Sequence, residues 1–385
     1  MLPGRPVRTN RDRYAPAVAD LHALPPQPEG TPWPTEAWEE ADPPPEAREA
    51  LPGALDRVLG PDADPAVGHT NAVAVVHRGR LVAERYGERL MGPLAELAGV
   101  VPGPLGPDDP LGSWSMAKSL LHLAVGVAQA RGVLDVTEPA PVPAWGDDGD
   151  PRSPITWDDL LTMRPGLEWT EVYEGFGADD VPDVVTMLYG EGAADMARYA
   201  ADKRLVHPPG TPEAYLYSSG TSNIVAGALR RALGDGGDDL GAWVREAVLD
   251  PIGVTSASFG TDGTGLWVAS SYVDMTARDW LRLGLLVLRG GTWDGTEVVP
   301  AAWVDHGRTP RSSDEEKLHG AHWWTVRDSS DGTFMAHGFE GQRLIMVPDR
   351  DLVLFRQGKT AAEGKDALNR HLKAVVDLFP RTTGG

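Results

Sequence analysis

An apolar run that predicts a helix over residues 115–131 begins with the stretch Gly112-Ser113-Trp114-Ser115-Met116-Ala117-Lys118-Ser119-Leu120-Leu121-His122. In a helix, Ser115 and Lys118 are three residues apart and share one face. The positive end of the helix dipole favours a developing alkoxide on Ser115. A lysine among apolar neighbours has a lowered pKa because desolvation disfavours its charge, and the neutral amine can accept the serine proton. The stretch therefore predicts a serine nucleophile with a lysine base.

The same spacing has a second interpretation. Ser115, Lys118, Ser119, His122 and Gln129 fall on one stripe at 100° per residue, which is typical of the wet face of an amphipathic helix. Against this, the rest of the helix is densely apolar, and the chain uses lysine rarely. We therefore prefer the interpretation in which Ser115 and Lys118 are catalytic.

Outward from this helix, strands are predicted near both ends of the chain. Residues 72–77 and 80–86 flank a short glycine turn, residues 343–347 and 352–355 form a similar pair, and a helix follows at 361–378. Further helices are predicted in the middle of the chain at 156–163, 183–189, 221–233, 239–249 and 275–289. This order predicts an α+β fold in which N- and C-terminal segments build one antiparallel sheet flanked by helices, with a mainly helical lobe inserted.

Three parts of the chain are expected from this layout. Residues 1–60 are rich in proline, which has no N–H for a ladder and does not fit inside a helix, so we expect an extended arm. Residues 61–165 and 285–385 are assigned to the sheet domain and residues 166–284 to the helical lobe. The active site is expected between the sheet domain and the lobe.

The composition excludes several function classes. The 385 residues carry a net charge of −21 and a pI near 4.8, which disfavours nucleic-acid partners because phosphate is repelled. The absence of cysteine excludes disulfides, thiolate catalysis and cysteine-bound metals. The polar, proline-rich start of the chain offers no apolar stretch for a signal peptide or a membrane span, so we expect a cytoplasmic protein.

Specific motifs then point to a family. Ser115-Met116-Ala117-Lys118, with the apolar helix and Arg131-Gly132-Val133-Leu134-Asp135 after it, resembles the first motif of the serine β-lactamase and penicillin-binding-protein superfamily. Residues 155–167 resemble the family's threonine, helix, leucine-pair and serine-glycine-leucine segment, with Pro165 in the place of serine. The resemblance covers about residues 65–380 and implies a β-lactamase-like fold.

The second motif departs from the family pattern. Residues 209–220 resemble the segment that reads Tyr-x-Asn in class C enzymes and their esterase relatives, but this chain has Tyr217-Ser218-Ser219. By resemblance, Tyr217 is the second proton-transfer group and protonates the leaving group. Without the motif, the favoured interpretation of Tyr217 is a core tyrosine with one hydrogen bond. The missing asparagine disfavours a true β-lactamase.

The third motif, Lys-Thr-Gly in β-lactamases, is absent as such. Residues 337–342 (His-Gly-Phe-Glu-Gly-Gln) precede a predicted strand and resemble the glycine-rich version found in 6-aminohexanoate-dimer hydrolases and related esterases. The resemblance makes His337, Gly338 and Phe339 candidate substrate-binding residues. It also implies that a backbone N–H near Phe339 pairs with that of Ser115 as an oxyanion hole. The residues alone leave His337 as a plain surface or core histidine.

The loop after residue 167 suggests the substrate. Residues 168–173 (Glu-Trp-Thr-Glu-Val-Tyr) resemble a loop of the nylon-oligomer hydrolases, and the resemblance implies that Tyr173 contacts the nitrogen of the scissile amide. One of the acidic residues that follow, Asp179, Asp180 or Asp183, is expected to hold a substrate ammonium, with Asp183 as the chosen candidate. The alternative is a solvated acidic loop on an already acidic protein.

Together these features predict a serine hydrolase that cleaves amide bonds of small linear substrates, such as 6-aminohexanoate oligomers, through an acyl-enzyme on Ser115. A carboxylesterase is the alternative enzyme, and a non-catalytic peptide-binding module is the alternative outside enzymes. No metal or organic cofactor is expected, because His319 and His322 have helical spacing but no third ligand nearby. No membrane partner is expected, and a homodimer is an expectation from relatives.

Overall fold

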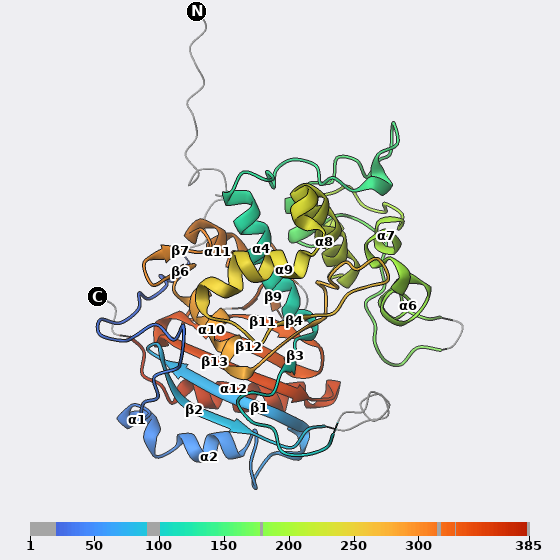
Figure 1. Cartoon of the computed structure of the whole chain (residues 1–385). Helices are drawn as coiled ribbons and strands as arrows, with labels where there is room; N and C mark the ends of the chain where they lie inside the picture. Colours follow the sequence, from blue (N-terminus) through green and yellow to red (C-terminus); the bar gives the residue numbers. More distant parts are fainter. Residues whose placement is uncertain (1–20, 91–100, 178–179, 314–316, 328, 383–385) are drawn as a thin grey trace, which may run out of the picture.

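The computed structural model of the chain describes residues 21–90, 101–177, 180–313, 317–327 and 329–382. Its centre is an antiparallel eight-stranded sheet in the order β2-β1-β13-β12-β11-β10-β9-β8 (Figure 1). The strands are β1 (His69–His77), β2 (Arg80–Tyr86), β8 (Ser312–Ser313), β9 (Lys317–His319), β10 (Trp324–Val326), β11 (Phe334–Gly338), β12 (Gln342–Val347) and β13 (Leu352–Lys359). The prediction of one antiparallel sheet from N- and C-terminal segments is confirmed, since β1 pairs with both β2 and β13.

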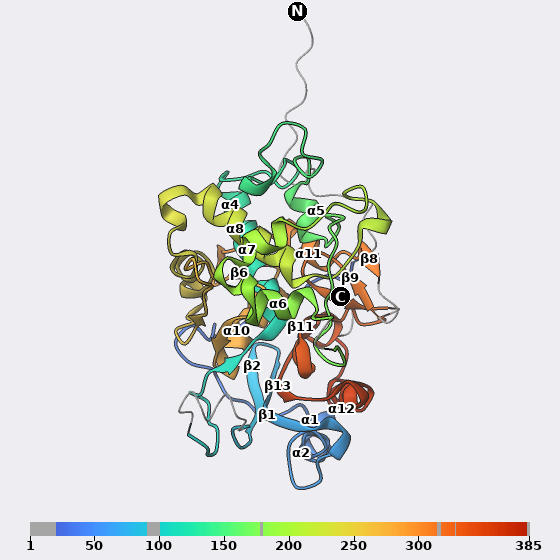
Figure 2. The same ribbon diagram turned by 90° about the vertical axis from the view of Figure 1, so that its right-hand side faces the viewer.

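Both faces of this sheet are buried, as the alternation of side chains along β1 shows. Val73 and Val75 pack with α12 (Lys365–Asp377) and α2 (Leu51–Asp56), whereas Ala72 and Ala74 belong to the larger core on the other side. Successive side chains of a strand point to opposite faces, so one strand serves two cores. Figures 1 and 2 place α12 and α2 at the base of the molecule, away from the helical lobe.

The larger core joins the sheet to the helices of the lobe. The remaining helices are α1 (Pro45–Arg48), α4 (Ala117–Ala130), α5 (Trp157–Leu161), α6 (Asp183–Tyr189), α7 (Met196–Ala201), α8 (Ser219–Leu233), α9 (Leu240–Val244), α10 (Ala277–Leu288) and α11 (Ala301–Arg308). Small sheets are formed by β3 (Leu111–Gly112), β4 (Ser258–Phe259) and β5 (Val273–Met275), and by β6 (Thr292–Trp293) and β7 (Thr296–Glu297). All the predicted helices are present, although a π-helical turn at Arg245–Leu249 follows α9.

Two details differ from the predicted layout. Helix α10 crosses the expected boundary at residue 284 and packs against β12 and β13, because its apolar side is long enough to cover that face of the sheet. Residues 45–56 of the expected extended arm form α1 and α2 instead. Proline is tolerated there because Pro45 and Pro52 occupy the first turns of these helices, where the N–H has no helical partner.

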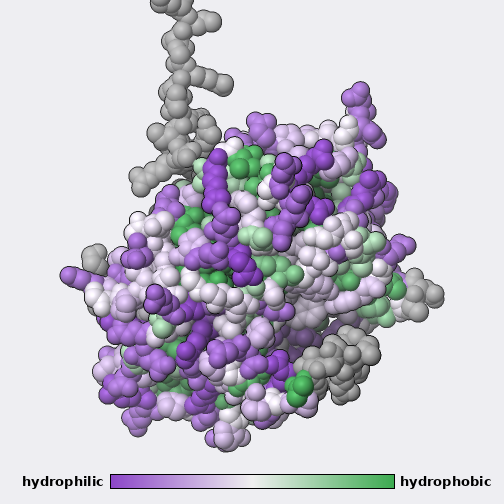
Figure 3. Space-filling model, viewed as in Figure 1, coloured by the Kyte–Doolittle hydropathy of each residue, from purple (hydrophilic) through white to green (hydrophobic). Residues whose placement is uncertain are grey.

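The outer surface agrees with the acidic composition. Hydrophilic residues cover most of the face in Figure 3, and apolar residues appear there only in small groups. Within the described residues, none of the helices combines the length and apolar character needed to cross a membrane.

Candidate active site

Ser115 lies between β3 and α4, in a short 3₁₀ turn formed by Trp114–Met116. It is 9% exposed. The residue before it, Trp114, has a φ of 43°, a left-handed conformation that costs a bulky residue of the order of 1–3 kcal/mol. Such strain persists only where the surroundings hold it, and the Trp114 ring packs edge-on against Phe339 at 5.7 Å. The turn therefore presents Ser115 in a fixed orientation at the start of the helix.

Lys118 lies one helical turn later and is 1% exposed. Its Nζ lies 2.8 Å from Ser115 Oγ, 3.0 Å from Ser219 Oγ and 2.9 Å from the carbonyl oxygen of Ser270. Burial lowers the pKa of Lys118 to about 8, against the opposing effect of the Glu171 carboxylate. The ammonium therefore loses its proton far more easily than that of an exposed lysine, and the neutral amine is within reach of the Ser115 hydroxyl.

Tyr217 lies just before α8 on the other side of Ser115. Lys118 Nζ lies 5.2 Å from the centre of its ring, and the tyrosine side chain is near enough to Ser115 and Trp324 for both to influence its pKa. Burial raises the pKa of Tyr217 above its usual value, although the nearby Ser115 hydroxyl acts in the other direction. Tyr217 is thus a neutral phenol that can donate a proton. The structure brings together the three predicted catalytic residues.

Ser219 stands where the family has asparagine, and it connects Lys118 to a carboxylate. The Glu171 carboxylate accepts hydrogen bonds from Ser219 Oγ (2.6 Å) and Ser219 N (2.9 Å), from the Tyr173 hydroxyl (2.9 Å) and from Trp169 Nε1 (2.6 Å). The Tyr173 oxygen also lies 3.4 Å from Ser219 Oγ. Glu171 is therefore the centre of a second group of polar contacts behind Lys118.

Tyr173 was the residue predicted from this loop, and Glu171 was given no role. A signal was present, because Trp169, Glu171 and Tyr173 alternate, and alternate residues of an extended segment point to the same side. Tyr173 also stacks on Phe339, with ring centres 4.5 Å apart. This loop and the third motif therefore meet beside Ser115.

Gly338 explains why the third motif needs glycine. A Cβ at Gly338 would lie 2.5 Å from the carbonyl oxygen of Ser113, so only glycine allows the end of β11 to approach the turn that carries Ser115. Phe339 follows in a 3₁₀ turn, in contact with Trp114 and Tyr173. The structure thus places Gly338 and Phe339 beside the Ser115 turn.

His337 is placed differently from its neighbours in the motif. It pairs with Arg343 across the β11–β12 ladder, and directly opposite residues share a face of the sheet. Its ring lies 6.3 Å from that of Trp324, and the Trp324 ring lies 5.1 Å from that of Tyr217. His337 therefore lies beside Trp324, whose ring in turn contacts Tyr217.

Asp183 is also placed differently from the expectation. It begins α6, and its carboxylate accepts bonds from Thr170 N and Thr170 Oγ1 (2.9 Å each), from the Tyr199 hydroxyl (3.2 Å) and from Lys203 Nζ. An internal lysine thus already neutralises the charge that was assigned to a substrate ammonium. Asp183 holds the loop before α6, and we withdraw it as a substrate-binding residue. Asp179 lies outside the described residues, and Asp180 is exposed.

A second buried polar chain runs from α4, one turn beyond Lys118. Trp323 Nε1 donates to His122 Nδ1 (3.1 Å), His122 Nε2 lies 3.1 Å from His306 Nδ1, and His306 Nε2 lies 2.8 Å from an oxygen of Asp158. Burial lowers the pKa of both histidines. One assignment of neutral tautomers satisfies every bond, with each Nδ1 as acceptor and each Nε2–H as donor.

The two histidines with helical metal spacing, His319 and His322, are held by other parts of the protein. His322 bonds to Ser222 Oγ and to the Leu161 carbonyl oxygen, both at 2.8 Å. His319 packs among aromatic rings, including that of Trp324 at 4.9 Å. In the described part of the chain, no three or more histidine, aspartate or glutamate side chains are grouped so that they could hold a metal ion.

Comparison with known proteins shows which family the sequence matches. The sequence profile of the family described as Beta-lactamase matches residues 62–376. An uncharacterised protein of Mycobacterium tuberculosis is 30% identical over 264 residues, covering 58% of this chain and 59% of the relative. The chain thus spans well under two thirds of that relative's length. A 6-aminohexanoate-dimer hydrolase of Paenarthrobacter ureafaciens is 28% identical over 273 residues, or 65% of this chain and 66% of the relative.

Solved structures share the fold. A Bacillus anthracis protein assigned as a 6-aminohexanoate-dimer hydrolase superposes with a TM-score of 0.66 at 20% identity, covering 97% of this chain and 91% of its own. Class C β-lactamases, penicillin-binding proteins and a family VIII carboxylesterase have the same fold. The predicted resemblance and the predicted β-lactamase-like fold are confirmed.

Proposed function

The chain belongs to the Beta-lactamase family, and we propose that it is a serine hydrolase in which Ser115 is the nucleophile, Lys118 the base and Tyr217 the acid for the leaving group. The observation that carries the proposal is the 2.8 Å hydrogen bond between Lys118 Nζ and Ser115 Oγ, with the centre of the Tyr217 ring 5.2 Å from the same nitrogen. A nucleophile within 2.8 Å of a buried amine whose pKa is lowered to about 8 satisfies the geometric and the electrostatic requirement together.

The proposed reaction proceeds in two steps. Ser115 Oγ attacks the carbonyl carbon, and its proton passes to the neutral amine of Lys118. As the tetrahedral intermediate collapses, the bond to the leaving group breaks, the leaving atom takes a proton from Tyr217, and the proton held by Lys118 restores the tyrosine. Water then attacks the acyl-enzyme, releases the carboxylic acid and returns the proton to Ser115.

We propose small linear amides, of the 6-aminohexanoate-oligomer type, as the substrate class. The Tyr173 hydroxyl donates its proton to Glu171, so its oxygen is left as an acceptor 3.4 Å from Ser219 Oγ, the atom that Lys118 also contacts. An acceptor suits the N–H of an amide, whereas an ester has no such hydrogen. Burial raises the pKa of Tyr173, so this phenol keeps its proton and the acceptor arrangement persists at neutral pH. The relative of Paenarthrobacter ureafaciens bears a name of this substrate class.

The test compares the purified wild-type chain with Ser115→Ala on two substrates, the linear dimer of 6-aminohexanoate and p-nitrophenyl butyrate. We expect both activities of the wild type to fall by at least about 10⁴-fold in the variant, because the acyl-enzyme no longer forms. Ester cleavage without amide cleavage would retain the mechanism and replace the amidase by the carboxylesterase. Equal activity of wild type and Ser115→Ala would overturn the mechanism.

Ser119→Ala is the matched control. Ser119 is on the same helix, one turn beyond Ser115, is 1% exposed, and donates a hydrogen bond to the His322 carbonyl oxygen at 2.7 Å. The control removes one hydroxyl from the same helix without touching the proposed proton path, and we expect it to keep activity within a few-fold of the wild type. If both variants lost activity alike, the loss in Ser115→Ala would reflect damage to the helix.

A further inference from the structure

A cavity of about 450 Å³ lies between the sheet and α12, apart from the Ser115 site. Its walls come from the β10–β11 connection, from β11 and β12, from α12 and from the C-terminal segment. None of the residues that line it belongs to the network of Ser115, Lys118 and Tyr217. The volume is within the range of about 300–1,000 Å³ that small-molecule sites occupy.

The cavity is lined by a buried arginine that is poorly paired. Arg343 is 2% exposed, and its hydrogen bonds in the described part of the chain go to the Gln342 carbonyl oxygen at 3.0 Å and to Asn369 Oδ1 at 3.4 Å. A guanidinium has five N–H groups, so most of its donor capacity is unused. No carboxylate of the described residues forms an ion pair with it.

The adjacent arginine provides an internal comparison. Arg356 lies directly opposite Arg343 on β13 and is also buried. It makes five hydrogen bonds, to the carbonyl oxygens of His69, Glu340 and Gly341 and, from two nitrogens, to Thr70 Oγ1. The fold therefore satisfies one buried guanidinium with its own oxygens and leaves the other facing a cavity.

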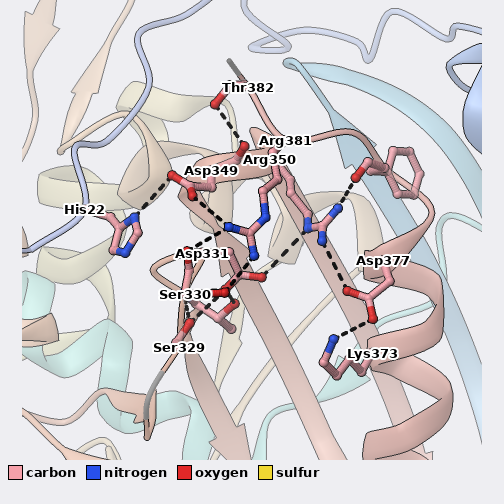
Figure 4. A network of polar contacts seen from close by, with 12 residues as sticks. His22, Ser329, Ser330, Asp331, Asp349, Arg350, Lys373, Asp377, Arg381 and Thr382 are labelled. Carbon is pink, nitrogen blue, oxygen red and sulfur yellow. Dashed lines mark hydrogen bonds and ion pairs between the residues drawn. The ribbon is translucent and has the colours of Figure 1, made fainter. Parts of the chain in front are cut away.

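The carboxylates that line the cavity are occupied elsewhere. Asp331 accepts bonds from Ser329 and Thr333 and lies 3.8 Å from Arg350 Nε, while Asp377 pairs with Arg350 at 3.2 Å and with Lys373 (Figure 4). Arg381 at the rim bonds to Ser330. These carboxylates thus have cations of their own, and the positive charge of Arg343 remains uncompensated on a chain with a net charge of −21.

The rest of the wall is apolar, with Met335, Ile345, Leu372 and Val376. An inorganic anion would leave this surface without a partner. We propose that the cavity binds a small monocarboxylate with an apolar body, whose carboxylate pairs with Arg343 while its body lies against the apolar wall. A planar guanidinium matches a carboxylate in a two-point contact, which gives the site both charge and orientation. This site is additional to the proposed hydrolase function.

Binding of sodium octanoate to the full chain tests the proposal, by calorimetry and by thermal shift in a low-chloride buffer. We expect octanoate to bind and to raise the melting temperature, whereas 1-octanol, octylamine and inorganic phosphate have at least tenfold weaker effects. Equal effects of octanol and octanoate would overturn the role of the charge. An equal effect of phosphate would overturn the role of the apolar wall.

Variants locate the site. Arg343→Met should weaken octanoate binding at least tenfold, and unchanged binding would overturn the proposal.

If that variant does not fold, the double variant Arg327→Glu with Arg381→Glu at the rim of the cavity replaces it, because both side chains are exposed. This double variant should weaken octanoate binding at least threefold. The matched control, Arg48→Glu with Arg370→Glu, makes the same charge change at exposed positions outside the cavity and should leave binding unchanged. Equal weakening in both double variants would overturn the site.

Discussion

Two series of buried hydrogen bonds begin on α4, one helical turn apart. They differ in whether they include a nucleophile that a substrate can reach. The chain at Lys118 ends at Ser115, a hydroxyl that still reaches the surface. The chain at His122 runs through His306 to Asp158, and neutral tautomers satisfy each of its bonds. Burial lowers the pKa of the base in both, yet only in the first does the base lie beside a nucleophile. The comparison indicates that a base with a lowered pKa can take part in catalysis only when it lies beside a reactive group that a substrate can reach.

Lys118→Met should have the largest effect on this comparison. It removes the base while keeping the length and apolar character of the side chain, so we expect kcat/KM for p-nitrophenyl butyrate to fall by about 10³-fold. A stopped-flow assay measures the fall, and far-UV circular dichroism confirms the fold. Retention of more than a tenth of the activity would show that another group accepts the Ser115 proton.

Tyr217→Phe should have a smaller and substrate-dependent effect. The variant loses the proton donor for the leaving group, so cleavage of the 6-aminohexanoate dimer should fall by about 10²-fold. p-Nitrophenolate leaves without protonation, so cleavage of its ester should fall much less. Competition between the two substrates in one reaction measures the ratio, and equal losses on both would contradict the acid role.

Raising the pH from 7 to 9 should increase activity by roughly tenfold. Lys118 acts as the neutral amine, and its pKa of about 8 means that the active fraction rises with pH and is close to a tenth at pH 7. Acylation should therefore increase from pH 6 and level off above about pH 9. Pre-steady-state bursts across this range measure it. A flat profile, or one that falls with rising pH, would contradict the assignment.

His306→Gln should have the smallest effect on activity and should act on stability instead. Breaking the buried chain should lower the free energy of unfolding by about 1–3 kcal/mol, with ester cleavage within threefold of the wild type at 25 °C. Because the folded pKa values of His122 and His306 are lowered, the unfolded state binds more protons below about pH 6.5, so wild-type stability should decline there as pH falls. Urea titrations at pH 5 and 7 measure both effects. A large loss of activity in this variant would show that the hydrogen bonds of His122 and His306 are also required for catalysis.

The fold and the pair of Ser115 and Lys118 could be predicted because they depend on local patterns, whereas Tyr217 was named only through its resemblance to the family's second motif. Ser115 and Lys118 are one turn apart, and the strands at both ends alternate or run apolar. Asp183 could not be placed, because its partner Lys203 is twenty residues away and only the folded chain brings the two together. The face of the sheet on which His337 lies depends likewise on its pairing with Arg343, on another strand.

Glu171 lies between these cases. Its alternation with Trp169 and Tyr173 was visible in the sequence, but its contact with Ser219 links segments that are 48 residues apart. The departure from the family's asparagine at Ser219 also gains a physical reason. A serine hydroxyl can bond to Lys118 and to Glu171 at once, so the carboxylate supplies the acceptor that an asparagine side chain would have brought.

Covalent labelling of Ser115 tests the central claim most directly. The native chain is treated with a fluorophosphonate at pH 8.5, digested, and mapped by mass spectrometry beside Lys118→Met and Ser119→Ala. We predict one adduct, on Ser115, at a rate that Ser119→Ala preserves and Lys118→Met lowers by at least about 10²-fold. An adduct on another serine, no adduct at all, or labelling of Ser115 at the same rate without Lys118 would contradict the account.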